Sequence, residues 1–412
     1  MNDDGSRTFP LLDIERAAQA IAELHAWLLG EEFLGLERYP WPGHLPSLYH
    51  DPGILYRFLR GTSNCWQGSA LSSAYYTWLA TTKPGLWTLC QTFMLCEPVE
   101  CARLETRLGT ARCRRLREAG IFAAEGGVYR SLARVTPLQG RLLWHDAPPG
   151  FRESWVFLGA DSLEFVRQLA PWAGRAGVRY GRVLDVCTGA GIHALMFSGM
   201  ADHVVGADIN PRAIAFARLN AEMNDVANVS FRLSNLFDGV PDGRFDLVVS
   251  NTPFVFLPDE LRPRCVDGDG GVMGIELALR LVEGLAVRLE PDGTAILHAN
   301  SPVVEGRDLL MEGLRARLGG GAWRVSLIPT HEFHDAAFYG LYVAHKIQRF
   351  VRYVVVLQAG QPFHLERPAL SPLRKAACTL RIAAVHAQGV RAGNRPSSQR
   401  ASVSVRSESG NG

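Results

Sequence analysis

Residues 182–191 read RVLDVCTGAG. Val183, Leu184 and Val186 form a short apolar run, which predicts a strand buried on both faces of a sheet. The glycine-rich turn that follows lets a ligand approach the backbone closely. Residues 192–200 can then form a helix whose free N–H groups point back at that ligand. This stretch therefore predicts one cradle made of a strand, a loop and a helix N-terminus.

A second strand is predicted at residues 204–208, and its last residue, Asp208, stands 17 positions after Gly191. At this spacing a carboxylate reaches the hydroxyls of a ribose. The pattern suits a dinucleotide as well as S-adenosylmethionine, so the first two motifs leave both cofactors open.

The strand predicted at residues 245–250 ends directly in Asn251-Thr252-Pro253-Phe254. An Asn-x-Pro sequence after a strand is also a common turn. Its position behind this strand of the predicted sheet favours a functional role. Pro253 restricts Thr252 to extended geometry, which fixes the direction of the Thr252 carbonyl.

Together these motifs resemble the class I methyltransferases that carry an Asn-Pro-Pro-Tyr/Phe motif. These are the protein-glutamine methyltransferases of release factors and the base-amine methyltransferases of ribosomal RNA, tRNA and DNA. The resemblance covers residues 155–358 and includes the glycine-rich segment 269–274. It implies a Rossmann-like, doubly wound, mostly parallel α/β sheet and S-adenosylmethionine as the cofactor. Thr252 replaces the first proline of the motif, and Asn235 stands where the third motif usually has an acid.

The resemblance also implies roles for individual residues. In these families the asparagine oxygen and the next backbone carbonyl accept hydrogen bonds from the substrate NH₂, which gives these roles to Asn251 and Thr252. Pro253 and Phe254 would lie beside a planar acceptor. The cofactor-binding residues implied are Asp185, Thr188, Gly189, Ala190, Gly191, Asp208, Ile209, Asn235, Leu236 and Asn251. No metal is expected, because methyl transfer from a sulfonium needs no Lewis acid, and residues 331–335 (HEFHD) are predicted to form a substrate-side loop.

The alternation of strands and helices after residue 182 predicts a parallel sheet covered on both faces. Strands are expected near 182–187, 204–208, 229–233, 245–250 and 294–299, and helices near 191–200, 211–223, 274–289 and 305–317. Strands at 323–328 and 350–357 are expected to form an antiparallel pair at the sheet edge. Three parts are predicted: a helical N-terminal domain at residues 1–148, a catalytic domain at 149–367 and a largely disordered extension at 368–412.

The N-terminal part contains a winged-helix outline. Two short helices, near 98–108 and 110–119, precede a hairpin signal at residues 125–127. The four arginines of the second helix could contact phosphates, but a dimer interface or a substrate lid is the stronger interpretation. Further along, Asp161 and Ser162 are expected to cap a helix that runs to about Leu169.

Composition limits the function classes. The chain has 43 basic and 41 acidic residues, and a net charge of +2 argues against a chain-wide nucleic-acid footprint. No run of 18 apolar residues and no cationic-then-apolar leader occurs, so a cytoplasmic protein without membrane contact is expected. The eight cysteines form no Cys-x-x-Cys pair and are expected to be reduced thiols.

Three functions stay open at this point. The first is an S-adenosylmethionine-dependent N-methyltransferase acting on a protein amide, a nucleobase amine or a small metabolite. The second is an O-methyltransferase acting on a small natural product. The third is a non-catalytic winged-helix regulatory protein that retains the cofactor fold. An NAD-dependent oxidoreductase is disfavoured, because no Tyr-x-x-x-Lys pair follows the predicted sheet.

Overall fold

The computed structural model of the chain describes residues 10–38, 70–147, 154–174, 177–334, 338–370 and 372. Of the extension predicted at residues 368–412, only residues 368–370 and 372 lie within these ranges. Among the described residues, no helix combines the length and the apolar character needed to cross a lipid bilayer.

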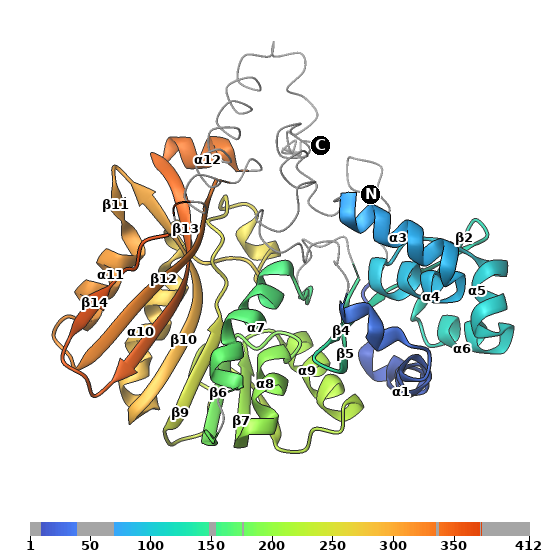
Figure 1. Cartoon of the computed structure of the whole chain (residues 1–412), viewed down its shortest axis with the longest axis horizontal. Helices are drawn as coiled ribbons and strands as arrows, with labels where there is room; N and C mark the ends of the chain where they lie inside the picture. The colour runs from blue at the N-terminus through green and yellow to red at the C-terminus, as the bar shows by residue number, and fades with distance from the viewer. Residues whose placement is uncertain are drawn as a thin grey trace, which may run out of the picture.

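A mixed sheet organises residues 180–366, and the N-terminal region lies beside it (Figure 1). Its strands lie in the order β14-β12-β13-β10-β9-β6-β7-β8, and the short β11 pairs with β10. The five strands from β10 to β8 pair in parallel, whereas β13 runs antiparallel to both of its neighbours. The strands are β6 Tyr180–Val186, β7 Ala201–Asp208, β8 Val229–Leu233, β9 Phe245–Asn251, β10 Leu289–Val304, β11 Arg307–Asp308, β12 Trp323–Phe333, β13 Ile347–Ala359 and β14 His364–Glu366.

The order of the strands reverses at β6. The chain first builds β7 and β8 on one side of β6, and then returns to place β9 on the other side. In open α/β sheets, ligands bind in the crevice outside the carboxyl ends of the strands at such a reversal. Val183, Leu184 and Val186 are at most 1% exposed, so the apolar run of β6 is buried on both faces as predicted.

Helices cover both faces of this sheet, as the sequence predicted. On one face α7, α8 and α9 bury side chains such as Phe165 and Phe197, and on the other α10 and α11 bury Leu281 and Leu314. The helices are α7 Ala160–Ala173, α8 Ile192–Phe197, α9 Pro211–Met223, α10 Glu276–Arg288, α11 Leu309–Leu318 and α12 Tyr339–Ala344.

The strands at the β12 side of the sheet differ from the sequence-based predictions in two respects. The predicted antiparallel pair forms between β12 and β13, but β13 is interior and β14 lies outside β12. His331, Glu332 and Phe333 belong to β12 and pair with residues 350–352 of β13, so the substrate-side loop predicted at residues 331–335 is wrong for these three residues. Residue 335 lies outside the described ranges. Backbone pairing with β13 outweighs the polar composition of this segment.

The N-terminal region is mainly helical and carries two small sheets. The hairpin β2–β3 turns at Gly126-Gly127 as predicted, and β1 completes an antiparallel sheet in the order β1-β3-β2. The hairpin β4–β5 was not predicted. These elements include α5 and α6 between β1 and β2; the winged-helix assignment itself stays a prediction. The elements are α1 Ile14–Leu29, α3 Ala70–Thr82, α4 Pro84–Leu89, a π-helical segment Cys90–Leu95, β1 Val99–Glu100, α5 Cys101–Leu108, α6 Thr110–Glu118, β2 Phe122–Glu125, β3 Val128–Ser131, β4 Ala133–Leu138 and β5 Arg141–Asp146.

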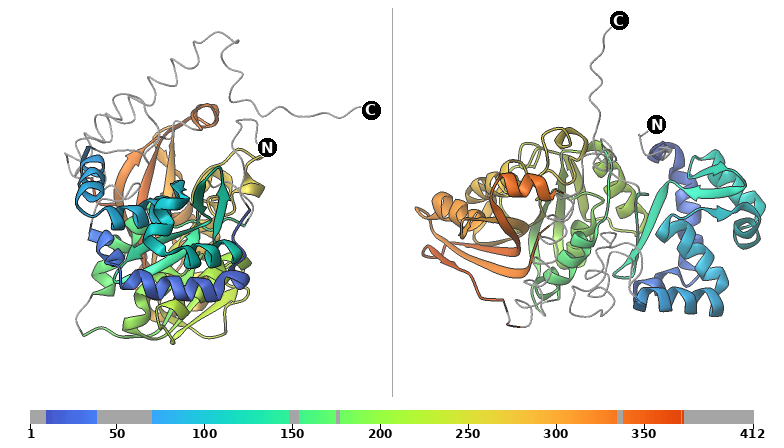
Figure 2. Two further views of the ribbon diagram at one scale, coloured as in Figure 1. Left: turned by 90° about the vertical axis from the view of Figure 1, so that its right-hand side faces the viewer. Right: turned by 90° about the horizontal axis from the view of Figure 1, so that it is seen from above.

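Helix α9 joins the N-terminal region to the sheet (Figure 2). Its Ile214 and Ala217 pack toward the sheet, whereas Phe216 and Leu219 belong to the apolar core of the N-terminal region. The side chain of Asn220 accepts a hydrogen bond from the Trp144 amide and donates to the Trp144 carbonyl, at 2.7 and 2.9 Å. The amide of Asn224 makes the same pair of bonds with Leu142. The two asparagines therefore bond the backbone N–H and C=O groups on one edge of β5, where a neighbouring strand would otherwise pair.

Candidate active site

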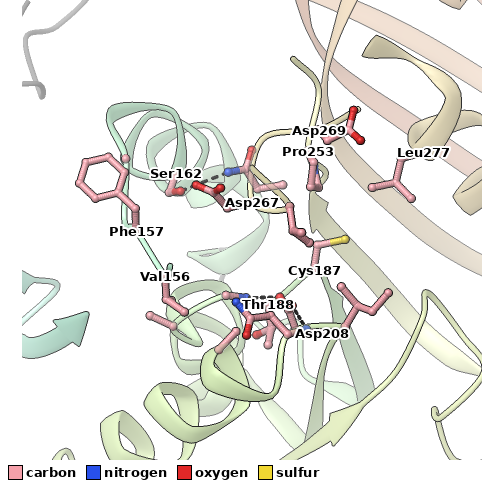
Figure 3. Close-up of a pocket in the computed structure, with 18 of the residues that line it drawn as sticks. Val156, Phe157, Ser162, Cys187, Thr188, Asp208, Pro253, Asp267, Asp269 and Leu277 are labelled. Carbon is pink, nitrogen blue, oxygen red and sulfur yellow. Dashed lines mark hydrogen bonds between the residues drawn. The ribbon is translucent and has the colours of Figure 1, made fainter. Parts of the chain in front are cut away.

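A cavity of about 360 Å³ opens at the carboxyl ends of β6, β7 and β9. This volume lies within the range of small-molecule sites, roughly 300–1,000 Å³. Figure 3 shows Thr188 and Asp208 toward one end and Pro253 and Asp269 toward the other. Eight of the residues predicted to bind the cofactor line this cavity: Thr188, Gly189, Ala190, Asp208, Ile209, Asn235, Leu236 and Asn251. Pro253 lines it as well.

The glycine-rich loop is held from below by Asp185. Asp185 is fully buried and does not line the cavity; its Oδ2 accepts from the Thr188 hydroxyl at 2.5 Å and from the Ala194 amide at 3.0 Å. Burial raises the pKa of Asp185 to about 7, although both donors act in the opposite direction. Asp185 therefore shapes the loop and the start of α8 rather than facing a ligand.

The loop backbone faces open space at Gly189. Its φ of +54° is in the left-handed region, and a Cβ there would meet no protein atom within 4 Å. At Gly191, with φ of +87°, a Cβ would lie 3.1 Å from the Cβ of Ala217, so this glycine allows α9 to pack against the loop. Gly191 thus has a packing role, whereas Gly189 leaves room for a ligand.

Asp208 ends β7 and faces the same cavity. Its Oδ2 accepts from the Gly189 amide at 2.8 Å and its Oδ1 from the Asn210 amide at 2.9 Å. A carboxylate has about four lone-pair positions, so Asp208 keeps acceptor capacity for a hydroxyl of a ligand. Burial raises the pKa of Asp208, whereas these backbone donors lower it. Asp208 therefore both fixes the loop and keeps capacity for a ligand.

Asn251, the last residue of β9, is held by three side chains. Its Nδ2 donates to Asp161 Oδ2 at 2.8 Å and to Ser162 Oγ at 3.2 Å. Its Oδ1 lies 2.9 Å from His298 Nδ1. Asp161 and Ser162 thus bond to Asn251; the cap they were predicted to form is wrong, since Gly159 caps α7 without a side-chain hydrogen bond. The geometry brings α7, β9 and β10 together at one point of the cavity wall.

The two other motif residues point away from the cavity. Thr252 is fully buried, and its hydroxyl donates to the His298 carbonyl at 2.9 Å. Phe254 is 8% exposed and lies against the Arg352 guanidinium, 4.8 Å from its ring centroid, and edge-on to His298. Neither side chain lines the cavity. The contact predicted between Phe254 and a planar acceptor stays a prediction.

A loop of mixed charge closes the far side of the cavity. Arg262 donates to both oxygens of Asp269, at 3.2 and 3.0 Å, so these two charges compensate each other. Asp267 faces the cavity and is accessible to water, yet many protein atoms surround it. This partial desolvation raises the pKa of Asp267 to about 6, and the nearby Asp161 and Asp208 carboxylates add to the effect.

Sequence reasoning missed three groups of residues that line the cavity or lie behind its wall. His298 lies inside an apolar strand, where a lone histidine gives no local signal. Asp267 precedes the glycine-rich segment that the family motif covers. The wall formed by residues 155–159 is held by Asp146, whose Oδ2 accepts from the Val156 amide at 2.9 Å. Each of these depends on contacts between segments far apart in the chain, which spacing within a motif cannot reveal.

Comparison with known proteins assigns the family. A family model described as the methyltransferase small domain matches residues 171–261. A release factor glutamine methyltransferase of Geobacter sulfurreducens is 30% identical over 251 residues, covering 52% of this chain and 84% of that protein. The chain belongs to the small-methyltransferase group of class I methyltransferases. S-adenosylmethionine is the cofactor of this methyltransferase family.

Other relatives match over shorter stretches. A ribosomal protein uL3 glutamine methyltransferase of Xanthomonas campestris is 34% identical over 135 residues, 31% of this chain, and the match spans only 43% of that relative. Among solved structures, a 16S rRNA N2 methyltransferase of T. thermophilus in complex with AdoMet and guanosine has a TM-score of 0.38 at 20% identity. That match covers 61% of this chain and 62% of the other.

The described residues fit this cofactor. Gly189 leaves space for close approach of a ligand, and Asp208 lines the cavity with acceptor capacity left. Carboxylates of Asp161, Asp208 and Asp267 face the cavity, which suits a ligand that carries a sulfonium and an ammonium group. No group of three or more possible metal ligands is placed to hold an ion within the described ranges.

Proposed function

We propose that this methyltransferase transfers a methyl group to a planar nitrogen, an amide or an exocyclic amine. The observation that supports this most is the position of Asn251: its side chain lines the same cavity as the glycine-rich loop and Asp208, and three partners hold it in one orientation. An oriented amide oxygen next to the cofactor loop is suited to receive an N–H of the acceptor.

The bound cofactor would supply an electrophilic methyl group on a positively charged sulfur. The protein's part is then to align the acceptor nitrogen and to exclude water, because in-line displacement depends on positioning. Thr188, Gly189, Ala190, Asp208, Ile209, Asn235 and Leu236 are the proposed cofactor contacts. Asn251 accepts from the acceptor N–H and directs the nitrogen lone pair into the cavity, with Pro253 beside it.

A protein side-chain amide is the first acceptor class to test, because the relatives of this chain include glutamine methyltransferases of a release factor and a ribosomal protein. Nucleobase amines and small metabolites are the other classes. In this proposal residues 149–367 carry the chemistry, and residues 1–148 form a lid or a dimer interface.

The arginines of α6 support a structural role for the N-terminal region. The Arg112 guanidinium stacks on Trp27, 4.7 Å from its ring centroid, and Arg115 lies 3.5 Å from Glu23. Arg114 lies 4.0 Å from Glu118 on the same helix. Three of the four candidate phosphate contacts therefore have partners within the protein, which favours an interface or lid over nucleic-acid binding.

The experiment supplies S-adenosylmethionine labelled in its methyl group, together with separate protein, RNA and metabolite fractions. The proposal expects label in one fraction, attached to nitrogen and stable to mild alkali. Binding of S-adenosylmethionine without label in any fraction would instead favour the non-catalytic regulatory protein.

An O-methyltransferase is the second candidate, and Asp267 is the observation that favours it. A hydroxyl acceptor must lose its proton during transfer, and a cavity carboxylate with a pKa raised to about 6 is suited to accept it. The base must be ionised, so activity should fall as the pH drops through about 6. Asp267→Asn should abolish this dependence along with most activity if the acceptor is a hydroxyl; an N-methyltransferase should retain activity in that variant.

A further inference from the structure

His298 lies beside Asn251 on the neighbouring strand, in a dry and tightly packed position. The register of β10 and β9 places His298 opposite Asn251. The imidazole is fully buried, stacks on Phe165 at 5.2 Å with an interplanar angle of 4°, and meets Phe254 edge-on. The ring therefore has little freedom to rotate.

The partners of Asn251 determine which end of its amide faces His298. The Asp161 carboxylate only accepts hydrogen bonds, so the amide nitrogen must lie on its side, at 2.8 Å. The amide oxygen is then directed at His298 Nδ1, at 2.9 Å. Nδ1 must carry a proton, because two lone pairs at that distance would repel each other.

The surroundings of His298 fit this tautomer. Burial lowers the pKa of His298 well below its ordinary value, and the nearby Arg352 cation acts in the same direction, so the ring is neutral. A proton on Nδ1 leaves Nε2 bare. In the part of the chain that the structure describes, Nε2 is buried and has no hydrogen-bond partner. The opposite tautomer would leave a buried N–H unsatisfied as well as a repulsive contact with Asn251.

His298 also contacts the next residue of the motif. The Thr252 hydroxyl donates to the His298 carbonyl at 2.9 Å. One residue of β10 thus holds the side chain of Asn251 through its ring and the side chain of Thr252 through its backbone. His298 therefore holds the residues on both sides of the Asn251–Thr252 peptide bond.

The side-chain amide of Asn251 keeps only one hydrogen-bonding position for the methyl acceptor. Both Nδ2 hydrogens of Asn251 are used by Asp161 and Ser162, and one lone pair of Oδ1 is used by His298. One Oδ1 lone pair remains. Asn251 can therefore receive an N–H or O–H donor but cannot donate to a carbonyl of the acceptor.

We propose that His298 is a positioning residue of the transfer reaction, which donates from Nδ1 to Asn251 and fixes the amide so that its oxygen receives a single N–H of the acceptor. This inference rests on the proposed function. It selects acceptors that present a primary amide or amine and disfavours acceptors that present only a carbonyl or ether oxygen at this position.

The first test needs neither cofactor nor acceptor. Long-range ¹H–¹⁵N correlation spectra of the full chain labelled in histidine rings should show His298 with a protonated Nδ1 and a bare Nε2. His298→Asn assigns the signal by its disappearance. A protonated Nε2 in the parent protein would overturn the inference, whether or not the protein binds S-adenosylmethionine.

The second test compares two variants with the parent. His298→Asn keeps a donor nitrogen near the position of Nδ1, and His298→Phe keeps a buried ring without a donor. Both should bind S-adenosylmethionine within about twofold of the parent, because His298 does not line the cavity. Against the acceptor found by fraction labelling, kcat should fall about tenfold or more in the Phe variant and be largely restored in the Asn variant.

The outcomes separate the two proposals. Failure of the parent protein to bind S-adenosylmethionine would reject the proposed function alone, since the ring spectrum is read without the cofactor. Equal kcat in the Phe variant and the parent would reject the role of His298 and leave the methyltransferase assignment standing. A loss confined to KM would also reject it, because positioning acts on the transition state.

Discussion

At the scale of single residues, the site depends on carboxylates and amides that each do two things. Asp208 illustrates this, since its carboxylate accepts from the backbone amides of Gly189 and Asn210 and also lines the cavity. Asp185 only holds the loop and does not face the cavity. Residue identity and spacing predicted that both acids belong to the site, but burial decided which of them faces the cavity.

Replacing Asp208 by Ala should weaken S-adenosylmethionine binding roughly 10- to 150-fold, because hydrogen bonds to a charged group contribute about 1.5–3 kcal/mol. Asp208→Asn is the matched control: it keeps one acceptor oxygen and should lose less. Titration calorimetry of both variants measures the difference. Affinity unchanged in the Ala variant would show that the ribose lies elsewhere.

At the scale of elements, the sequence predicted those parts of the fold whose signals are local. The strand near 182–187 and the helix near 211–223 were predictable, because an apolar run and a proline at the start of a helix are signals contained in a few residues. In the structure Asn210 caps α9, and its side chain accepts from the Arg212 amide. The β4–β5 hairpin and the position of β14 were not, because these elements depend on partners distant in the chain. The site divides in the same way: the glycine loop was predictable, and His298 was not.

The contact between α9 and β5 gives an element-scale prediction. Asn220 is fully buried, so Asn220→Ala leaves the Trp144 amide and carbonyl without partners. Each unsatisfied group costs about 1–3 kcal/mol. Asn224→Ala, the matched control, removes the equivalent pair at Leu142, where the asparagine is only half-buried and water can replace it. Urea unfolding should show a clearly larger loss of unfolding free energy for Asn220→Ala than for Asn224→Ala. Equal losses would mean that the buried hydrogen bonds to the edge of β5 do not hold this strand in place.

At the scale of the whole molecule, the apolar core of the N-terminal region extends onto helix α9 and the glycine-rich loop. Phe216 of α9 and Ala190 of the cofactor loop belong to the same cluster as Leu24 and Trp144. Arg212 adds polar contacts between the two regions. It forms an ion pair with the nearly inaccessible Asp146 and donates to the Leu12 carbonyl at 2.7 Å. Asp146 in turn holds Val156 of the cavity wall. These contacts therefore connect the N-terminal region to the wall of the cavity.

These contacts predict that the N-terminal region and the sheet unfold cooperatively. Arg212→Ala leaves the buried Asp146 charge unpaired and should cost about 3–5 kcal/mol, with a lower melting temperature for the whole described fold. Adding Asp146→Asn to Arg212→Ala removes the stranded charge and should recover part of that loss. Two separate transitions in the parent protein, with only one moved by Arg212→Ala, would show that the two regions unfold independently.

The central claim is that Asn251 presents the acceptor to a methyl group held in the cavity beside it. The measurement that tests it most directly compares the parent with Asn251→Ala in transfer of labelled methyl to the acceptor fraction, at saturating S-adenosylmethionine. Loss of one oriented acceptor group typically reduces the rate by about 10²–10³. We expect a reduction of this size in kcat, with cofactor affinity close to that of the parent, because the interaction matters most in the transition state. Equal labelling by both proteins would contradict the account and place the chemistry at another residue.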